Sequence, residues 1–401
     1  MSLAPFGYFA AGASEAISQY WATAETSLGG ASDDMAVDGD GNVYWLRNDP
    51  TEAKNYVVKF DTLGTVLWQK EAAETASNIE YSQIATDTAG NIYLWDRPDE
   101  RIVKLDTNGT ELWAYTYAGM EPSDLVVDSS GNIYVSSGAT DNLMKLNSSG
   151  TILWAKSYTE GTTTYRALSL DSSNNPWLLA ELNSDLRLFK LDVSDGSIVT
   201  EIKKNSSDNW TEMVIDSNGN MYVSYASGSY LYIRKFDTSG TEQGSLRFAA
   251  STTLSDHSLA IDSTDNVYLS VFKSTGGESL IVKLNSSMAS QWQRTSSSSP
   301  SYADPEWTKI AVSGSSFYVS GITTVKLPTD GSFPGGGSYT LYTVNSLDYG
   351  YFSSTTLSST TQTDLSGDSG TTSTSTPTIT PSSYTAGFSA GSLTFALTSI
   401  G

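Results

Sequence analysis

The sequence contains no cysteine and only one histidine, His257, among its 401 residues. The lack of cysteine excludes disulfides, thiolate metal ligands and thiol catalysis. A lone histidine cannot build a histidine-rich metal site, and at the start of an expected strand its role is more often structural than catalytic. These absences favour a scaffold or binding protein over an enzyme, and we expect neither a cofactor nor a bound metal.

Basic residues are scarce as well, because 22 Lys and Arg stand against 44 Asp and Glu, for a formal net charge of −22. An acidic surface repels phosphate backbones and anionic headgroups, which argues against nucleic acid and membrane surfaces as partners. The sequence has no apolar run of membrane-spanning length, and residues 1–16 lack the basic region of a secretory signal. We therefore expect no membrane insertion and no signal peptide.

One pattern of about 45 residues recurs along the chain. It reads apolar-x-apolar-Asp, a turn ending in Gly-Asn, and Val/Ile-Tyr-apolar, as in MAVDGDGNVYWL. After a variable gap follow apolar-x-Lys-Phe-Asp, a second turn ending in Gly-Thr, and apolar-Leu-Trp, as in VVKFDTLGTVLW. The seventh copy, IAVSGSSFYVSG, is degenerate. The anchoring residues of the seven copies are Asp38, Asp87, Asp128, Asp171, Asp216, Asp262 and Ser313.

Each copy contains four runs of strand length with alternating polarity, separated by turn residues. Aspartate caps each hairpin turn, and Gly or Asn accepts its positive φ. Four antiparallel strands repeated at this period predict an all-β fold, a seven-bladed β-propeller over residues 17–330. The last copy lacks a clear fourth strand. Residues 17–23 resemble the fourth strand of a blade, but no other strands of a blade precede them. We expect this N-terminal strand to complete the last blade and close the ring.

The blades resemble two repeat families. Gly-Asn-Val/Ile-Tyr after an Asp turn is similar to the bacterial SBBP and NHL propeller repeats, and the motif at residues 57–68, echoed at 102–113 and 143–154, resembles quinoprotein-type repeats. The resemblance implies that a tryptophan docks between neighbouring blades, at Trp68, Trp113, Trp154 and Trp292. The whole layout, with a start that lacks a signal, Trp-Ala-Thr at residues 21–23 and a Gly-rich stretch followed by a Ser/Thr-rich tail, resembles propeller proteins of tailed, particularly marine, bacteriophages, and this resemblance implies a virion location.

Composition changes after the repeats. Residues 331–338 form a Gly-rich linker, and residues 339–401 are rich in Ser and Thr and contain no Lys, Arg or His. A polar tail of this kind is often disordered, but YTLYTV and SLTFALTSI alternate like strands. We favour a β-type assembly or anchoring segment that pairs with copies of itself or with another virion protein.

The first strand of each blade is expected to begin at the mouth of the central channel, on the face that carries the variable loops. Large aromatic residues recur six positions before the anchor, and polar residues follow them. Aromatic faces beside carboxylates suit sugar recognition. The alternative is that the rings only pack against neighbouring loops. The candidate ligand-binding residues are Tyr81, Tyr165, Trp210, Trp307, Asp34, Asp124, Glu212, Arg166 and His257.

A calcium site and a pair of catalytic carboxylates are the two other kinds of site that the sequence raises. The turn Asp38-Gly-Asp-Gly-Asn42 resembles the start of a calcium-binding loop. An EF-hand loop, however, needs Gly at its sixth position and Glu at its twelfth, where this chain has Val43 and Asp49. A hairpin turn is the better interpretation. Most carboxylates fall in the repeated turns, although a glycosidase pair drawn from two blades stays open.

The sequence therefore predicts a non-enzymatic virion protein, a tail-fibre or receptor-binding appendage. Its propeller face would contact host-surface polysaccharide and its C-terminal segment would mediate attachment or oligomerisation. The alternatives are a capsid-decorating protein without a ligand, and a bacterial extracytoplasmic scaffold or glycan-active enzyme.

Overall fold

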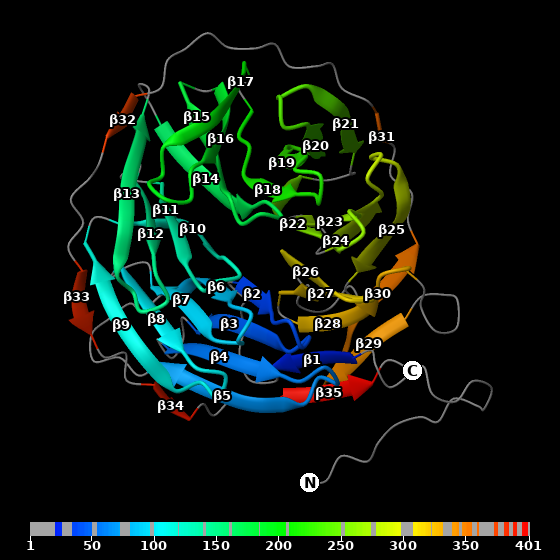
Figure 1. Cartoon of the computed structure of the whole chain (residues 1–401). Coiled ribbons are helices and arrows are strands. Elements are labelled where there is room, and N and C mark those ends of the chain that lie inside the picture. Colours follow the sequence, from blue (N-terminus) through cyan, green and yellow to red (C-terminus); the bar gives the residue numbers. More distant parts are fainter. Residues whose placement is uncertain are drawn as a thin grey trace.

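Seven four-stranded antiparallel blades stand around a central axis in the computed structural model (Figure 1). The structure describes residues 21–25, 34–331 and 339–399, with gaps at 50–53, 73–80, 97–99, 119, 139–141, 160–162, 184, 206–207, 250–252, 274–277, 298–307, 322, 345–346, 355–358, 361–372, 376–380, 385–387 and 391–394. Residues 1–20, which include the lead segment and the start of the expected closing strand, lie outside the described residues. Within the described part of the chain, no helix is long and apolar enough to cross a membrane.

The first three blades follow the predicted repeats. Blade 1 contains β2 (Asp34–Val37), β3 (Val43–Asp49), β4 (Lys54–Phe60) and β5 (Val66–Ala72). Blade 2 contains β6 (Tyr81–Thr86), β7 (Ile92–Asp96), β8 (Arg101–Leu105) and β9 (Glu111–Tyr117). Blade 3 contains β10 (Pro122–Val127), β11 (Ile133–Ser137), β12 (Asn142–Leu146) and β13 (Ile152–Thr159).

The next three blades repeat the arrangement. Blade 4 contains β14 (Thr163–Leu170), β15 (Pro176–Leu182), β16 (Asp185–Leu191) and β17 (Ile198–Lys204). Blade 5 contains β18 (Glu212–Ile215), β19 (Met221–Ser227), β20 (Tyr230–Phe236) and β21 (Glu242–Ala249). Blade 6 contains β22 (Leu254–Ile261), β23 (Val267–Lys273), β24 (Glu278–Leu284) and β25 (Ser290–Ser297).

The seventh blade is completed from the other end of the chain. Its own strands are β26 (Lys309–Ser313), β27 (Ser316–Ser320) and β28 (Thr323–Pro328), and β1 (Trp21–Glu25) pairs antiparallel with β28, Ala22 opposite Val325. The seven-bladed fold and its closure by an N-terminal strand are therefore confirmed.

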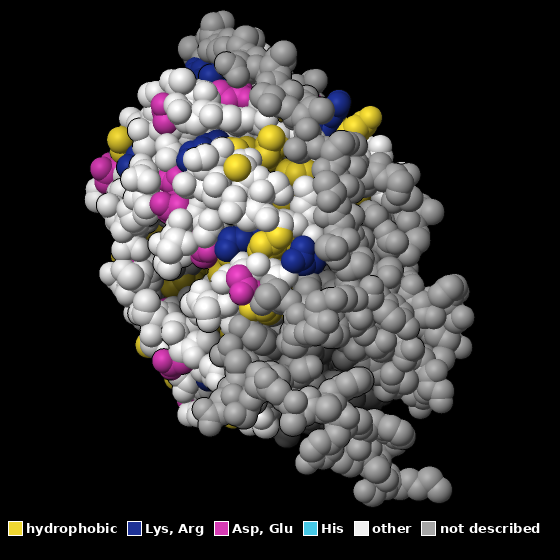
Figure 2. Space-filling view, turned by 90° about the vertical axis from the view of Figure 1, so that its right-hand side faces the viewer, with side chains coloured by type: hydrophobic (Ala, Val, Ile, Leu, Met, Phe, Trp, Pro, Cys, Tyr) yellow, Lys and Arg dark blue, Asp and Glu magenta, His cyan; other side chains and the backbone are white. Residues whose placement is uncertain are grey.

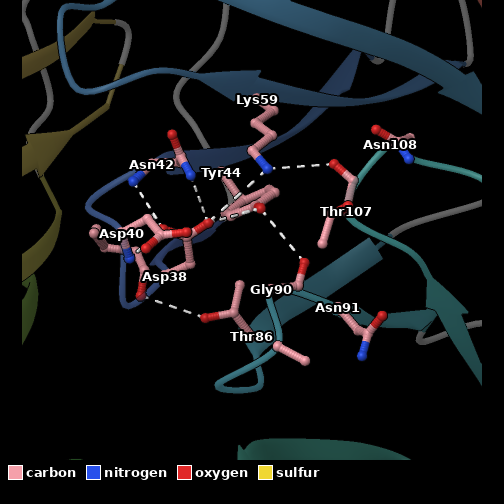
Figure 3. Close-up of polar contacts among 12 residues, drawn as sticks. Asp38, Asp40, Asn42, Tyr44, Lys59, Thr86, Gly90, Asn91, Thr107 and Asn108 are labelled. Atoms are coloured by element: carbon pink, nitrogen blue, oxygen red, sulfur yellow. Dashed lines mark hydrogen bonds and ion pairs between the residues drawn. The ribbon is translucent and has the colours of Figure 1, made fainter.

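The anchoring aspartates build the hairpin turns. Asp38 Oδ1 accepts hydrogen bonds from the backbone N–H groups of Asp40 (3.0 Å) and Asn42 (2.8 Å), while Gly41 takes the positive φ of 80° that the turn needs. Asp38 Oδ2 accepts from the Asn42 side chain at 2.8 Å and from the Tyr44 hydroxyl at 3.0 Å. Because these donors occupy its oxygens, Asp38 is a turn residue (Figure 3).

A lysine joins six of the blades to the next, and in four of these blades a tryptophan makes the same contact. Lys59 Nζ lies 5.0 Å from the centre of the Tyr44 ring and donates to the Thr107 carbonyl of blade 2 at 3.3 Å. The Trp68 indole N–H donates to the same carbonyl at 2.9 Å. Figure 3 shows the lysine contact. The tryptophan contact recurs at Trp113, Trp154 and Trp292, and the lysine contact at Lys104, Lys145, Lys235, Lys283 and Lys326.

Blade 4 departs from this scheme. Trp177 replaces the tyrosine of the second strand, and Thr200 stands where the outer strands of blades 1, 2, 3 and 6 have the tryptophan that makes this contact. Lys190 donates to its own anchor, Asp171 Oδ2, at 2.9 Å. In blades 1, 2, 3, 5 and 6 a tyrosine hydroxyl donates to this oxygen of the anchoring aspartate. Because Trp177 has no hydroxyl, Asp171 Oδ2 is open to Lys190, which then bonds within its own blade.

We expect Trp68→Phe to destabilise the fold by about 1 kcal/mol, because the Thr107 carbonyl loses one of its two donors. Equilibrium urea denaturation measures this. The matched control is Leu67→Ala, one residue away and 52% exposed, which should change stability by less than about 0.5 kcal/mol. Equal effects of the two changes would contradict the joining role of Trp68.

The C-terminal segment surrounds the ring. Its strands are β29 (Tyr339–Val344), β30 (Leu347–Ser354), β31 (Ser359–Thr360), β32 (Ser373–Ser375), β33 (Pro381–Tyr384), β34 (Phe388–Ala390) and β35 (Phe395–Ser399). They add an outer strand to blades 6, 5, 3, 2, 1 and 7 in that order, and Figure 1 shows them in orange and red around the periphery. The expected β-type pairing is present, and its partner in the described residues is the propeller of the same chain.

Candidate functional site

The candidate site is a set of charged side chains at the inner wall of the ring. Strands β2, β6, β10, β14, β18, β22 and β26 stand nearest the centre (Figure 1). The position four residues before each anchor lies near the start of these strands, at the end opposite the anchored turns. Its occupants in blade order are Asp34, Gln83, Asp124, Ala167, Glu212, Ser258 and Lys309.

Alternate blades place a carboxylate here, and each one contacts the next blade. Asp34 Oδ2 accepts a hydrogen bond from the backbone N–H of Ile84 at 2.9 Å, and Asp124 Oδ2 accepts from that of Leu168 at 2.6 Å. Glu212 accepts from the N–H of Leu259. These bonds fix the carboxylates in orientation, which a binding site needs.

Irregular pairing contributes to this geometry. The register shifts between Tyr81 and Gln83 in β6, and between Tyr165 and Ala167 in β14. A similar shift occurs near the start of β10. A bulge adds one residue to a strand and re-aims the side chains that follow it, which is common beside functional sites.

Lys309 is the counter-charge of this set. Its Nζ lies 4.0 Å from Asp34 Oδ1, and its side chain is 28% exposed. Burial alone would lower the pKa of Lys309, but surrounding carboxylates outweigh it and raise that pKa above its usual range. Those carboxylates are Asp34, Glu212, Asp124 and Asp256.

The three carboxyl groups are not all ionised at neutral pH. Burial raises the pKa of Glu212 to about 8, despite the attraction of Lys309, and raises that of Asp124 to about 6. Burial also raises the pKa of Asp34, against the opposing effect of Lys309. At neutral pH, Glu212 is therefore mainly protonated and can donate a hydrogen bond, while Lys309 stays charged.

Two of the predicted aromatic residues belong to the core. Tyr165 is 1% exposed, and its hydroxyl donates to the Tyr158 carbonyl at 3.1 Å. Trp210 is 2% exposed and packs edge-on against Tyr225 with ring centres 4.6 Å apart. The expectation that these two rings offer a face to a sugar was wrong, because burial leaves them no open face.

Of the remaining predicted residues, His257 lies beside the set. Its Nε2 is 3.3 Å from the hydroxyl of Thr211, the neighbour of Glu212, and the charge of Lys309 acts on its ring. Arg166 pairs with Glu181 at 2.9 Å on the sheet of blade 4. His257 is 9% exposed and its Nε2 lies 3.0 Å from Ser224 Oγ; burial lowers its pKa to about 4, so the ring is neutral. The backbone of Tyr81 pairs with Asp96, and Trp307 lies outside the described residues.

The structure therefore brings together Asp34, Asp124 and Glu212 and adds Lys309, which the sequence interpretation missed. The signal was present, because Lys309 stands four residues before Ser313, the degenerate anchor of the seventh repeat. Among the described residues, no group of three or more His, Cys, Asp or Glu is placed to hold a metal ion. On the face seen in Figure 2, the acidic and basic side chains of the described residues are interspersed.

The ring and its inner wall define the class: this is a seven-bladed β-propeller. The chain is similar to virginiamycin B lyase from Staphylococcus aureus (TM-score 0.60, 13% identity, 77% of this chain and 99% of that one). It is also similar to a catalytically inactive variant of that lyase solved with quinupristin (0.60, 13%, 76% and 97%) and to a streptogramin B lyase (0.60, 14%, 78% and 99%). No protein-family model and no curated protein matches the chain. At a sequence identity of 13–14%, the likeness to these structures establishes the fold alone.

Proposed function

We propose that the protein is a non-enzymatic binding module whose channel mouth takes a polar host-surface glycan, and that it acts as a receptor-binding appendage of a phage particle. The observation that carries the binding proposal is the set of three carboxylates, Asp34, Asp124 and Glu212, gathered around one lysine. The virion assignment rests on the sequence layout described above.

The chemistry of the mouth favours a ligand rich in hydroxyl or amine groups. Ionised carboxylates accept hydrogen bonds from sugar hydroxyls and attract the ammonium group of an amino sugar, while a protonated Glu212 can donate. With Tyr165 and Trp210 in the core, stacking on these rings contributes nothing, so polar contacts supply the specificity. Several copies on one particle would convert weak single-site binding into avidity.

The test is binding of the purified protein to a glycan array that includes amino sugars, and to host cells. We expect Asp124→Asn with Glu212→Gln to weaken binding about tenfold or more, because Asp124 loses its negative charge and both carboxyl groups become amides with a different set of donors and acceptors. The control is Asp40→Asn, the same chemical change in an exposed turn at the opposite end of the strands. A folded double variant that binds as tightly as the unchanged protein would exclude this mouth as the site.

A second candidate is an enzyme that acts on a glycan or a related substrate. It is favoured by the raised pKa of Glu212, about 8, because a buried carboxylic acid that titrates near neutral pH suits general acid catalysis. The structural neighbours named as lyases show that this fold can carry catalysis. Turnover that Glu212→Gln abolishes would replace the binding proposal with this one.

A further inference from the structure

The strand that closes the ring has partners on both of its edges. On one side, Ala22 lies opposite Val325 of β28, and on the other it lies opposite Thr398 of β35. The pairing with β35 runs over the whole of β1, from Trp21 opposite Ser399 to Glu25 opposite Phe395. The N-terminal strand of the propeller is therefore held between its own blade and the last strand of the chain.

The path of the C-terminal segment leads to this position. From blade 6 it contacts blades 5, 3, 2 and 1, against the direction of the repeats, and reaches blade 7 with its final strand. Each contact is an antiparallel ladder on the outer strand of a blade, such as Ser389 opposite Glu71 and Ser382 opposite Thr116. The segment uses main-chain pairing, which suits its Ser- and Thr-rich composition.

Without β35, the closing strand would be an edge strand of five residues. Edge strands fray, because one row of their N–H and C=O groups has no partner in the sheet. The ring can open only where its two ends meet, and this is the contact between β1 and β28. A second ladder on β1 makes opening depend on the release of β35.

We propose that strands β30 to β35 form a latch: β35 locks the N-terminal strand in blade 7, and the preceding strands fix β35 in place by pairing with blades 6, 5, 3, 2 and 1. The latch acts on the rate of ring opening. Contacts that form after the transition state for folding mainly slow unfolding, and a strand that docks on a finished blade edge is of this kind.

The test uses two neighbouring proline substitutions, Ala396→Pro and Leu397→Pro. Consecutive residues of a strand direct their N–H groups to opposite edges, so one substitution removes a donor aimed at β1 and the other removes a donor aimed away. Each variant is thus the matched control of the other. A third variant ends the chain after Thr394 and lacks β35 altogether.

Hydrogen exchange of the β1 amides and the unfolding rate in denaturant are the two measurements. We expect one proline variant and the shortened chain to unfold about tenfold faster or more, with faster exchange in β1. The outer strand of blade 4, β17, has no added strand among the described residues and serves as the internal reference for exchange. Unchanged unfolding and β1 exchange in all three variants would overturn the latch, and so would an equal loss of protection in β17.

Discussion

Replacing Glu212 with glutamine should make the protein more stable at pH 9 by about 3 kcal/mol and leave its stability at pH 4 unchanged. Burial raises the pKa of Glu212 from an ordinary 4.5 to about 8, so the folded protein holds this proton more tightly than the unfolded chain does. The unchanged protein therefore loses stability as the pH rises from about 4.5 through about 8. Glutamine keeps the shape and hydrogen-bonding capacity without the charge.

Urea denaturation at pH 4, 6, 7 and 9 measures this difference. The control is Asp237→Asn, in an exposed turn whose hydrogen bonds lower the pKa of that carboxylate, with the Ser239 hydroxyl contributing most. Its loss should remove stability above about pH 4, which is the opposite sign. A Glu212→Gln variant whose stability parallels that of the unchanged protein at every pH would show that Glu212 is not desolvated as described.

Replacing Asp96 with alanine should destabilise the protein by about 3–5 kcal/mol. Asp96 and Arg101 lie opposite each other in the hairpin of β7 and β8, and are 0% and 3% exposed. Arg101 Nε donates to Asp96 Oδ2 at 2.9 Å, and an Nη2 group contacts the same oxygen. The alanine variant removes this carboxylate from beside the buried guanidinium, so the charge loses an attraction that offsets part of the cost of its burial.

The second half of this experiment removes both charges. In the variant Asp96→Leu with Arg101→Met, apolar side chains fill the space, and at least half of the lost stability should return. Equilibrium unfolding of the two single variants and the double variant gives the coupling energy. A double variant as unstable as Asp96→Ala would indicate that the cost arises from lost packing rather than from the loss of this ion pair.

The fold could be predicted because its determinants are local and repeated. Each turn combines an aspartate with a residue that tolerates positive φ, such as Asp38 with Gly41, and this chemistry is readable in the sequence. The closing strand was recognisable because it shares the Trp-containing pattern of the other outer strands. The path of strands β29 to β35 around the ring could not be predicted from the sequence. These strands pair with the blades through their main chains, and main-chain pairing alone does not specify which blade edge a strand meets.

The site could be predicted only in part, and the bulges explain why. In a regular strand, positions six and four before the anchor face the same way. In β14, the extra residue Arg166 between Tyr165 and Ala167 changes this alternation, so Tyr165 is directed into the core. Asp124 follows the irregular segment of β10, while Asp34 and Glu212 begin strands whose pairing is regular, and all three carboxylates were identified. To predict how one inserted residue changes the direction of the side chains, the partner strand and its register must be known. The sequence of a single strand does not contain this information.

The irregular fourth blade bears on how a repeat protein of this kind can change its sequence. Its lysine bonds within its own blade, and its outer strand lacks the tryptophan found in four of the other blades. A closed ring holds every blade from two sides, so the loss of one polar joint does not detach the blade from its neighbours. Because the contacts between blades are equivalent, one repeat can change its sequence while the others keep the ring closed. New surface chemistry can therefore arise on that repeat with the smallest loss of stability of the whole fold.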